Sequence, residues 1–184
     1  MSKQILVITG SPRKEGNSDM LADAFIKGAK TNGHKVDKFI SAAHQIDGCL
    51  GCNGCWSKDT PCIQNDDFND KLAPLLEKAD MLVFCMPLYA YSFPTQIKGP
   101  LDRLFPYGKE SWMRPLKVKE SAMIICGADD VAEAFHAVVE SYKHLIGFFN
   151  WKNHGELVVL NVNDKGDVKN TNGLQQAEEF GKNI

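Results

Sequence analysis

Apolar residues recur along this chain with two different periods, and the two periods alternate. Short apolar runs are typical of strands, and continuous ones of strands buried on both faces. They predict strands over Gln4 to Thr9, Lys35 to Ile40, Met81 to Met86, Ser121 to Cys126 and Glu156 to Val162. Longer stretches with apolar residues three or four positions apart predict amphipathic helices. These helices cover Asn17 to about Asn32, Asp66 to Lys78, Gln96 to Phe105, Asp130 to Phe149 and about Gly173 to Lys182.

The alternation of strands and helices predicts an α/β fold. Parallel strands joined by right-handed crossovers form a doubly wound sheet with helices on both faces. Pro74 is expected to bend or delay the second helix. No repeat, low-complexity tract or linker-like stretch divides the chain, so we expect one domain over residues 1–184. Ligands of such sheets bind outside the carboxyl ends of the strands.

Composition and charge narrow the class of protein further. The chain is 43% hydrophobic and 24% charged, which is ordinary for one globular domain. Its formal net charge of -2 lacks the basic excess that nucleic-acid binding requires. The apolar run Ile5 to Ile8 is too short for a secretory signal, and no run reaches the ~20 residues of a membrane span. We therefore expect a cytoplasmic protein that contacts neither nucleic acid nor membrane.

The loop after the first strand has the chemistry of a phosphate site. It reads Gly10-Ser11-Pro12-Arg13-Lys14-Glu15-Gly16-Asn17-Ser18 and leads into a helix start. Backbone N–H groups, the helix dipole, the hydroxyls of Ser11 and Ser18 and the Arg13 guanidinium would together bind a phosphate. The glycine pattern of dinucleotide sites and the Lys-Ser/Thr of a nucleotide P-loop are missing, which favours a monophosphate. The alternative is a capped turn with solvent-exposed charges.

The loop after the third strand is rich in aromatic residues. It reads Pro87-Leu88-Tyr89-Ala90-Tyr91-Ser92-Phe93-Pro94. The side chains of Tyr89 and Tyr91 suit the face of a flat heteroaromatic ring, and the backbone amides suit its edge. The alternative is that these aromatic residues pack in the core beneath the loop.

Together these loops resemble those of the flavodoxin-like NAD(P)H-dependent FMN reductases. The matching segments are Gly10-Ser11-Pro12-Arg13 with Asn17-Ser18, Pro87-Leu88-Tyr89, and Lys98-Gly99-Pro100-Leu101-Asp102-Arg103. The similarity extends to the C-terminal helix. It implies a five-stranded sheet of order 2-1-3-4-5, noncovalent FMN, and a homodimer or homotetramer with flavin near a subunit interface.

The same resemblance implies which residues bind the cofactor. The FMN phosphate would be held by Ser11, Arg13, Asn17 and Ser18. The isoalloxazine would be bordered by Pro87, Leu88, Tyr89, Ala90 and Gly127. Tyr91 of the aromatic loop completes the predicted cofactor-binding set.

Three features outside these motifs carry expectations of their own. Asp102-Arg103 is expected to be structural, anchoring the loop or a neighbouring subunit. Asp129 and Asp130 make the fourth loop acidic, where many relatives are more neutral, and a nearby charge would disfavour anionic reduced flavin. The long connection from Pro106 to Val118 predicts a substrate lid or an oligomer contact.

Most of the six cysteines fall in one short segment that contains Cys49, Cys52, Cys55 and Cys62. The two overlapping C-x2-C steps and the later cysteine resemble the compact motif of the iron-sulfur flavoproteins, a branch of the same superfamily. Thiolates at this spacing can surround a 4Fe-4S cluster. Two alternatives stay open: metal-free cysteines that pack or are redox-active, and a zinc site, which normally has a longer spacer. The remaining two lie in predicted strands and are expected to be inert core residues: Cys85 and Cys126.

These features predict an FMN-dependent oxidoreductase. Electrons would pass from NADH or NADPH through bound FMN to free flavin, a quinone or another small acceptor. We assign no side chain to catalysis, because the flavin is the reactive group and the histidines show no ligand or triad spacing. With a bound cluster the protein would instead be a relay that exchanges single electrons with a ferredoxin-like partner. The same features would also fit a flavodoxin-type carrier without turnover or a zinc-stapled binding module.

Overall fold

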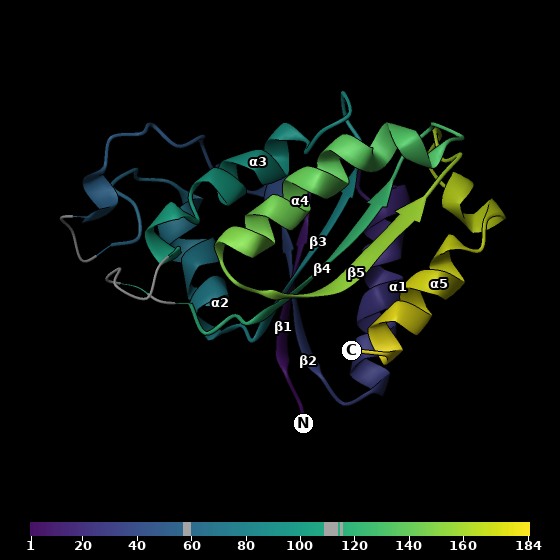
Figure 1. Cartoon of the computed structure of the whole chain (residues 1–184), viewed down its shortest axis with the longest axis horizontal. Coiled ribbons are helices and arrows are strands. Elements are labelled where there is room, and N and C mark those ends of the chain that lie inside the picture. Colours follow the sequence, from purple (N-terminus) through teal and green to yellow (C-terminus); the bar gives the residue numbers. More distant parts are fainter. Residues whose placement is uncertain (57–59, 109–113, 115) are drawn as a thin grey trace.

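The computed structural model describes residues 1–56, 60–108, 114 and 116–184. Its five strands form one parallel sheet of order β2-β1-β3-β4-β5, which confirms the predicted topology (Figure 1). The strands are β1 Gln4–Thr9, β2 Lys35–Ile40, β3 Met81–Pro87, β4 Glu120–Cys126 and β5 Lys152–Val159. The helices are α1 Asn17–Thr31, α2 Ala73–Lys78, α3 Thr95–Asp102, α4 His136–Phe148 and α5 Gly173–Lys182. The predicted lid or oligomer contact at 106–118 falls in part on residues 109–113 and 115, which lie outside the described residues.

Helices cover both faces of the sheet (Figure 1). Helices α1 and α5 lie on one face, where Phe25 and Ala177 share a buried apolar cluster with Val7. Helices α2, α3 and α4 lie on the other face, where Tyr142 belongs to a second cluster with Leu6. Successive residues of β1 therefore point into two separate cores, which is why this strand is apolar throughout.

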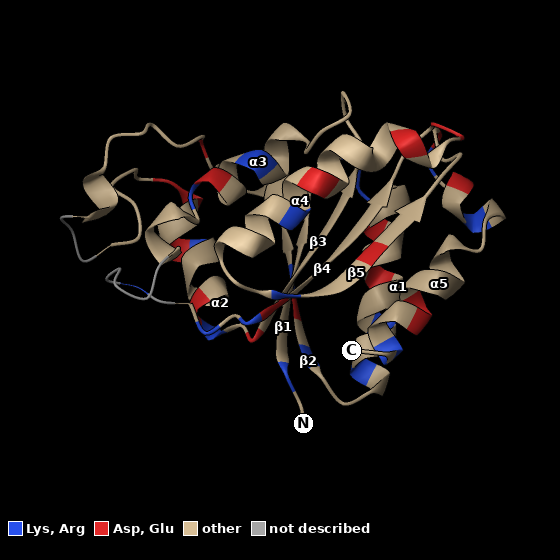
Figure 2. Ribbon diagram, viewed as in Figure 1, with Lys and Arg blue, Asp and Glu red and all other residues tan. Residues whose placement is uncertain are grey.

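Helices α1 and α5 approach each other so closely that glycine is required at the contact. A Cβ atom on Gly28 would lie 1.9 Å from the Glu178 carbonyl oxygen, and one on Gly181 would lie 2.1 Å from the Phe25 carbonyl oxygen. On the outer side, acidic and basic residues intermingle along both helices (Figure 2), and Lys27 Nζ lies 2.8 Å from Glu178 Oε2. The C-terminal helix is thereby fixed against the helix that follows the first loop.

The fifth strand begins and ends earlier than its sequence predicts. It spans Lys152–Val159, whereas the apolar run indicated Glu156 to Val162. The pairing register with β4 shifts between Ser121 and Met123, and Gly155 there has a φ of 113°. This irregularity lets the strand continue through a polar stretch that shows no strand pattern.

Several helix ends also differ from the prediction. Residues Phe68–Leu72 form a π-helical turn, and the α-helix follows only at Ala73. Pro74 lies in its first turn, where its missing N–H costs no hydrogen bond, so the helix is delayed as expected. Ala132–Phe135 forms a 3-10 turn ahead of α4. Among the described residues, no helix combines the length and the apolar character that crossing a membrane requires.

Candidate functional site

A cavity of about 240 Å³ opens where β1, β3 and β4 end. The loops that follow these strands meet there, as expected for a parallel sheet of this topology. Every residue predicted to bind the cofactor lines this cavity except Ala90 and Tyr91: Ser11, Arg13, Asn17, Ser18, Pro87, Leu88, Tyr89 and Gly127. The structure thus brings together two loops that are more than 60 residues apart in the sequence.

The first loop forms a tight turn at the start of α1. The Arg13 N–H donates to Ser11 Oγ at 3.1 Å, and the Gly16 N–H donates to the Arg13 carbonyl at 3.1 Å. Gly16 occupies the N-cap position and has no side chain with which to cap the helix. The first N–H groups of α1 are therefore available to an anion, and the helix dipole favours negative charge there.

The acidic residue in the first turn of α1 does not oppose this role. Asp19 accepts a hydrogen bond from the Glu15 N–H at 3.0 Å and lies 2.6 Å from Lys38 Nζ. The positive charge of Lys38, on the neighbouring strand β2, thus compensates the charge of Asp19. Asp19 is also not part of the wall of the cavity.

The side chain of Asn17 holds a loop from the far end of the chain. Its Nδ2 donates to the Asp164 carbonyl at 2.9 Å, and its Oδ1 accepts from the N–H groups of Gly166 at 2.9 Å and Val168 at 3.3 Å. The amide is therefore engaged with loop 163–168, and what Asn17 has left for a phosphate is its backbone N–H. Arg13 also reaches this loop, donating from Nη1 to the Asn163 carbonyl at 3.3 Å.

Loop 163–168 adds residues to the cavity that the sequence reasoning missed. Asn163 and Lys165 belong to the cavity wall. Lys165 Nζ lies 3.4 Å from Glu15 Oε2, a pair that is more than half exposed on both sides. The available signal was a lysine in the loop after the fifth strand, at the same edge of the sheet as loop 10–18.

The aromatic loop turns back on itself at its tip. Tyr89 and Ser92 exchange backbone hydrogen bonds of 3.3 and 2.9 Å, with Ala90 and Tyr91 between them. Both central residues have left-handed backbones, with φ values of 47° and 59°. Non-glycine residues rarely adopt this conformation. The turn keeps Tyr89 at the cavity and carries Tyr91, 62% exposed, beyond it.

The ends of β3 and β4 form the remaining wall. The Leu88 N–H donates to the Cys126 carbonyl at 2.8 Å, and a Cβ atom on Gly127 would lie 3.2 Å from Leu88 Cβ. Cys126 borders the cavity although it is buried, and burial raises the pKa of its thiol to about 12. Neither Asp129 nor Asp130 lines the cavity, so the acidic loop does not place its charge there.

Cys85 lies fully buried in β3, as expected for a core residue. Its thiol donates to the Ser18 carbonyl at 3.0 Å, in the first turn of α1. Burial raises the pKa of this thiol well above its ordinary value. A neutral thiol therefore supports the start of α1 through this hydrogen bond.

The four clustered cysteines line a second and larger chamber of about 440 Å³. Cys49 and Cys52 are exposed, Cys55 and Cys62 are half-buried, and all four are free thiols. Burial, together with the neighbouring thiols, raises the pKa of Cys55. Among the described residues, no three Cys, His, Asp or Glu side chains gather closely enough to hold one metal ion. A four-iron cluster attaches each thiolate to a different iron atom, so it needs its ligands farther apart than a zinc ion does.

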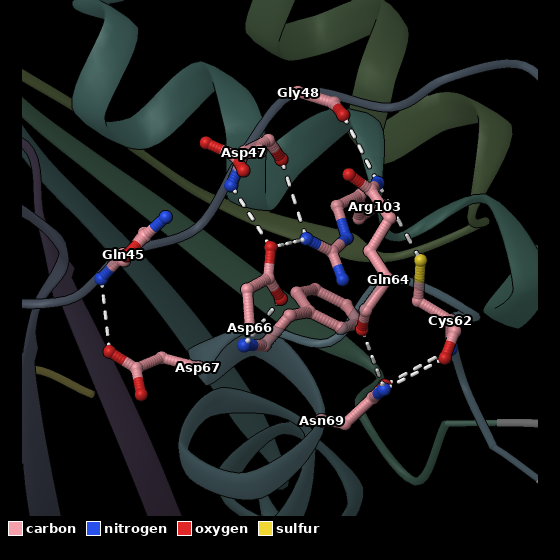
Figure 3. Close-up of polar contacts among 10 residues, drawn as sticks. Gln45, Asp47, Gly48, Cys62, Gln64, Asp66, Asp67, Asn69 and Arg103 are labelled. Atoms are coloured by element: carbon pink, nitrogen blue, oxygen red, sulfur yellow. Dashed lines mark hydrogen bonds and ion pairs between the residues drawn. The ribbon is translucent and has the colours of Figure 1, made fainter.

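Hydrogen bonds join the two ends of the cysteine segment, residues 45–47 and 66–67 (Figure 3). We call these joined ends the neck. Gln45 and Asp67 exchange two of them, because the Gln45 N–H donates to the Asp67 carboxylate at 2.9 Å and the Asp67 N–H donates to the Gln45 carbonyl at 3.0 Å. The Asp47 N–H donates to Asp66 Oδ2 at 3.1 Å. The two ends of the segment are thus held side by side.

Arg103, at the end of α3, completes the neck. Its Nη1 forms an ion pair with the Asp66 carboxylate and donates to the Asp47 carbonyl at 3.4 Å (Figure 3). Its guanidinium lies 4.4 Å from the centre of the Phe68 ring. Asp102 instead pairs with Lys98 on the exposed side of the helix. The expected anchoring of a loop is therefore found in Arg103 alone.

Comparison with known proteins assigns the family. The model of the NADPH-dependent FMN reductase family matches residues 4–156. An iron-sulfur flavoprotein of Archaeoglobus fulgidus is 32% identical over 138 residues, which are 73% of this chain and 61% of that protein. An iron-sulfur flavoprotein of Methanosarcina thermophila is 24% identical over 187 positions, covering 98% of this chain and 93% of that protein. The chain therefore spans less than two thirds of the first relative and nearly all of the second.

A solved structure supports the fold assignment. The NAD(P)H:quinone oxidoreductase from Methanothermobacter marburgensis superposes with a TM-score of 0.77 at 16% identity, covering 100% of this chain and 97% of that one. At this identity the likeness concerns the fold, which is the flavodoxin-like fold of the reductases. With the family model matched over most of its length, the chain belongs to the NADPH-dependent FMN reductases, a family of flavoprotein oxidoreductases.

Proposed function

We propose that this protein binds FMN in the cavity at the carboxyl edge of the sheet and passes electrons from NADH or NADPH to a small acceptor. The acceptor classes are free flavin, a quinone or an electron-poor aromatic compound. The observation that carries the proposal is the meeting of the phosphate-type loop at Ser11 to Ser18 with the aromatic loop at Pro87 to Tyr89 in one cavity. FMN has a phosphate at one end and a flat ring at the other, which matches this pairing of loops.

The phosphate end of the cavity has the donors that a phosphate requires. The open N–H groups at the start of α1, the hydroxyls of Ser11 and Ser18 and the guanidinium of Arg13 would hold its oxygens. Lys165 adds a second positive charge from loop 163–168. Loop 163–168, which the side chain of Asn17 holds in place, would therefore complete the phosphate site.

The ring end of the cavity is formed by backbone and apolar side chains. Leu88, Tyr89 and Gly127 would border the ring, and the packing around Gly127 leaves little room for a side chain at this position. When bound, FMN accepts a hydride from the nicotinamide and passes electrons onward. The residues of this wall would orient the ring, and no side chain is needed as acid or base for hydride transfer. We further propose a homodimer or homotetramer as the working assembly.

An absorption spectrum and an activity assay test this proposal. We expect protein purified without oxygen to show flavin bands, or to acquire them with one FMN per chain, and to oxidise NADH or NADPH in the presence of a quinone. Absence of flavin binding after FMN is added would contradict the proposal. Bound FMN with negligible oxidation of either nucleotide would favour a carrier without turnover.

A second redox site in the cysteine chamber is our second proposal. Four free thiols line one chamber, and no three of the described ligand side chains form a single-ion site. This donor set suits a 4Fe-4S cluster, which would be held by Cys49, Cys52, Cys55 and Cys62 and would supply single-electron transfer. Support also comes from two relatives that are named iron-sulfur flavoproteins. The protein would then be a relay between FMN and a ferredoxin-like partner.

Metal analysis of the anaerobic protein tests the second site. We expect four iron atoms and four acid-labile sulfides per chain, with a broad brown absorption that dithionite bleaches. Cys62→Ala should lose most of this iron, whereas Cys85→Ala, which removes a buried thiol of β3, should keep it. Bound zinc without sulfide would indicate a zinc-stapled site, and a metal-free yellow protein would leave the four thiols as structural or redox groups.

A further inference from the structure

Arg103 is a buried cation that borders the cysteine chamber. Its side chain is 1% exposed, and it lines the chamber together with Cys62 and Gln64. The carboxylate of Asp66 compensates its charge from the opposite side, at the neck. The net charge of the pair is zero, and the N–H groups of Arg103 that do not bind Asp66 are those that could contact a ligand in the chamber.

Only some of the N–H groups of the Arg103 guanidinium have hydrogen-bond partners. Arginine carries five N–H groups in a rigid planar fork. Nη1 is engaged by Asp66 and by the Asp47 carbonyl. Nε and Nη2 are buried and have no hydrogen-bond partner among the described residues. Buried donors without partners are rare because each one costs stability, so an acceptor such as a water molecule or a ligand is expected beside them.

Sulfur atoms in the same chamber already accept hydrogen bonds from the chain. The Gly51 N–H donates to Cys49 Sγ at 3.4 Å. Gln64 Nε2 donates to Cys62 Sγ at 3.8 Å and to the Gly48 carbonyl at 3.1 Å. In Figure 3 the Arg103 guanidinium lies between the neck and the side of the chamber where Gln64 contacts Cys62. N–H groups thus already contact the sulfur atoms of Cys49 and Cys62 in this chamber.

We propose that the Nε and Nη2 groups of Arg103 are hydrogen-bond donors to the sulfur atoms of the cluster that the cysteines hold. The inference rests on the second proposal above, that the chamber holds a 4Fe-4S cluster. Hydrogen bonds to sulfur stabilise the reduced, more negative state of a cluster more than the oxidised state. Arg103 would thus raise the reduction potential of the cluster, in addition to closing the neck.

A charge-conserving substitution separates these two roles. Arg103→Lys keeps a cation for Asp66 but removes the planar fork and its extra N–H groups. Lys98→Arg is the matched control, because Lys98 is on the same helix, half exposed, and outside the chamber wall. Iron, sulfide and the midpoint potential are measured for both variants and for the unaltered protein, with the potential followed by electron paramagnetic resonance during a redox titration.

The expected result is a change of potential without loss of the cluster. At the midpoint potential of the unaltered protein, the ratio of reduced to oxidised cluster should fall about tenfold in Arg103→Lys, the effect of one charge-assisted hydrogen bond. Lys98→Arg should titrate like the unaltered protein. A cluster in Arg103→Lys that titrates at the unaltered potential would overturn the inference and leave the cluster proposal standing. An unaltered protein without iron and sulfide would overturn both.

A second measurement decides the matter if Arg103→Lys fails to fold or loses its cluster. The unaltered protein is grown with ¹⁵N-labelled arginine, reduced, and studied by pulsed hyperfine spectroscopy. A ¹⁵N coupling to the cluster is expected. The chain has two other arginines, of which Arg13 lines the other cavity and Arg114 pairs with Glu77 at 3.5 Å. Absence of any arginine nitrogen coupling would overturn the inference.

Discussion

The Arg103 guanidinium and the Asp66 carboxylate form an ion pair that is shut off from water, with exposed side-chain fractions of 1% and 4%. The two residues come from different parts of the chain, the end of α3 and the neck of the cysteine segment. Burial on its own would raise the pKa of Asp66. Hydrogen bonds from Arg103 and from the N–H groups of Asp47 and Phe68 outweigh burial, so the pKa of Asp66 lies below its ordinary value of 3.8.

Removing the carboxylate should therefore destabilise the fold strongly. Asp66→Asn leaves Arg103 as a buried charge without a counter-ion, which typically costs about 3–5 kcal/mol. Asp102→Asn breaks only the exposed pair with Lys98 and should cost less than about 1 kcal/mol. Urea unfolding of both variants at pH 7 measures the difference. Equal losses of unfolding free energy in the two variants would show that the buried pair stabilises the fold no more than the exposed pair does.

The ion pair of Arg103 and Asp66 should also make the stability of the fold depend on pH. Because the pKa of Asp66 is lowered on folding, its contribution to stability is complete above pH 3.8 and is lost as the pH falls through the folded-state value. The difference in unfolding free energy between the unaltered protein and Asp66→Asn should therefore narrow below pH 3.8. A difference that stays constant down to the acid transition would mean that Asp66 titrates normally in the folded protein.

Arg13→Ala should weaken FMN binding through the phosphate alone. Loss of a charge-assisted contact of about 1.5–3 kcal/mol corresponds to a rise in the dissociation constant of roughly tenfold to a hundredfold. Riboflavin has no phosphate, so its affinity should not change. Lys14→Ala removes a neighbouring charge that does not line the cavity and should leave FMN affinity unchanged at physiological salt. An equal loss of affinity for FMN and riboflavin would place Arg13 outside the phosphate site.

His34 should make the fold sensitive to mild acid. It is 7% exposed, and its Nδ1 accepts a hydrogen bond from the Lys3 N–H at 3.1 Å. Burial first, and then the charges of Lys3 and the N-terminal amine, lower the pKa of His34 below 6.5. Since protonation is disfavoured in the folded state, the contribution to stability is complete above pH 6.5 and declines as the pH falls.

Substitution of His34 provides the measurement. His34→Asn keeps an acceptor for the Lys3 N–H and removes the titrating group, so its unfolding free energy should fall less between pH 6.5 and pH 5 than that of the unaltered protein. His136→Gln, which changes an exposed residue of α4, is the matched control. Identical pH profiles for His34→Asn and the unaltered protein would contradict the assignment.

Two glycines in helices should respond to alanine in opposite directions. At Gly28 a Cβ atom would lie 1.9 Å from the Glu178 carbonyl oxygen, so Gly28→Ala forces α1 and α5 apart and should cost about 3 kcal/mol or more. At Gly147 nothing lies within 4 Å of the added atom. Gly147→Ala should therefore stabilise the protein by about 0.5–1 kcal/mol through helix propensity. Thermal unfolding of both variants tests the pair.

The sequence predicts the sheet and most of the cavity because both follow from local pattern and topology. Ser11, Leu88 and Gly127 each lie within two residues of the end of a strand, and parallel strands bring their carboxyl ends together. Asn163 and Lys165 also follow the fifth strand at this edge, a signal that the sequence offered, but the hydrogen bonds from Asn17 that hold their loop at the cavity are revealed by no periodicity.

The start of β5 and the neck also depend on non-local structure. The strand passes through Gly155 at a bulge, where a polar stretch with a left-handed glycine gives no strand signal. Arg103 is recognisable as a structural residue, but its partners at Asp47 and Asp66 follow only from the packing of α3 against the neck. A Cβ atom on Gly99 of α3 would lie 3.0 Å from the Ile46 carbonyl oxygen, which shows how closely the two segments meet.

The closed neck has a consequence for how this fold evolves. The cavity at the sheet edge is made by the connections after β1, β3, β4 and β5, whereas the cysteines occupy the connection after β2 alone. The free-energy cost of closing a loop, which is entropic, rises by only about 0.6 kcal/mol for each doubling of the loop length. A connection whose ends are already joined can thus gain or lose residues at little cost to the sheet. The second redox centre that we propose would therefore depend on this one connection, and its loss would leave the cavity at the sheet edge intact.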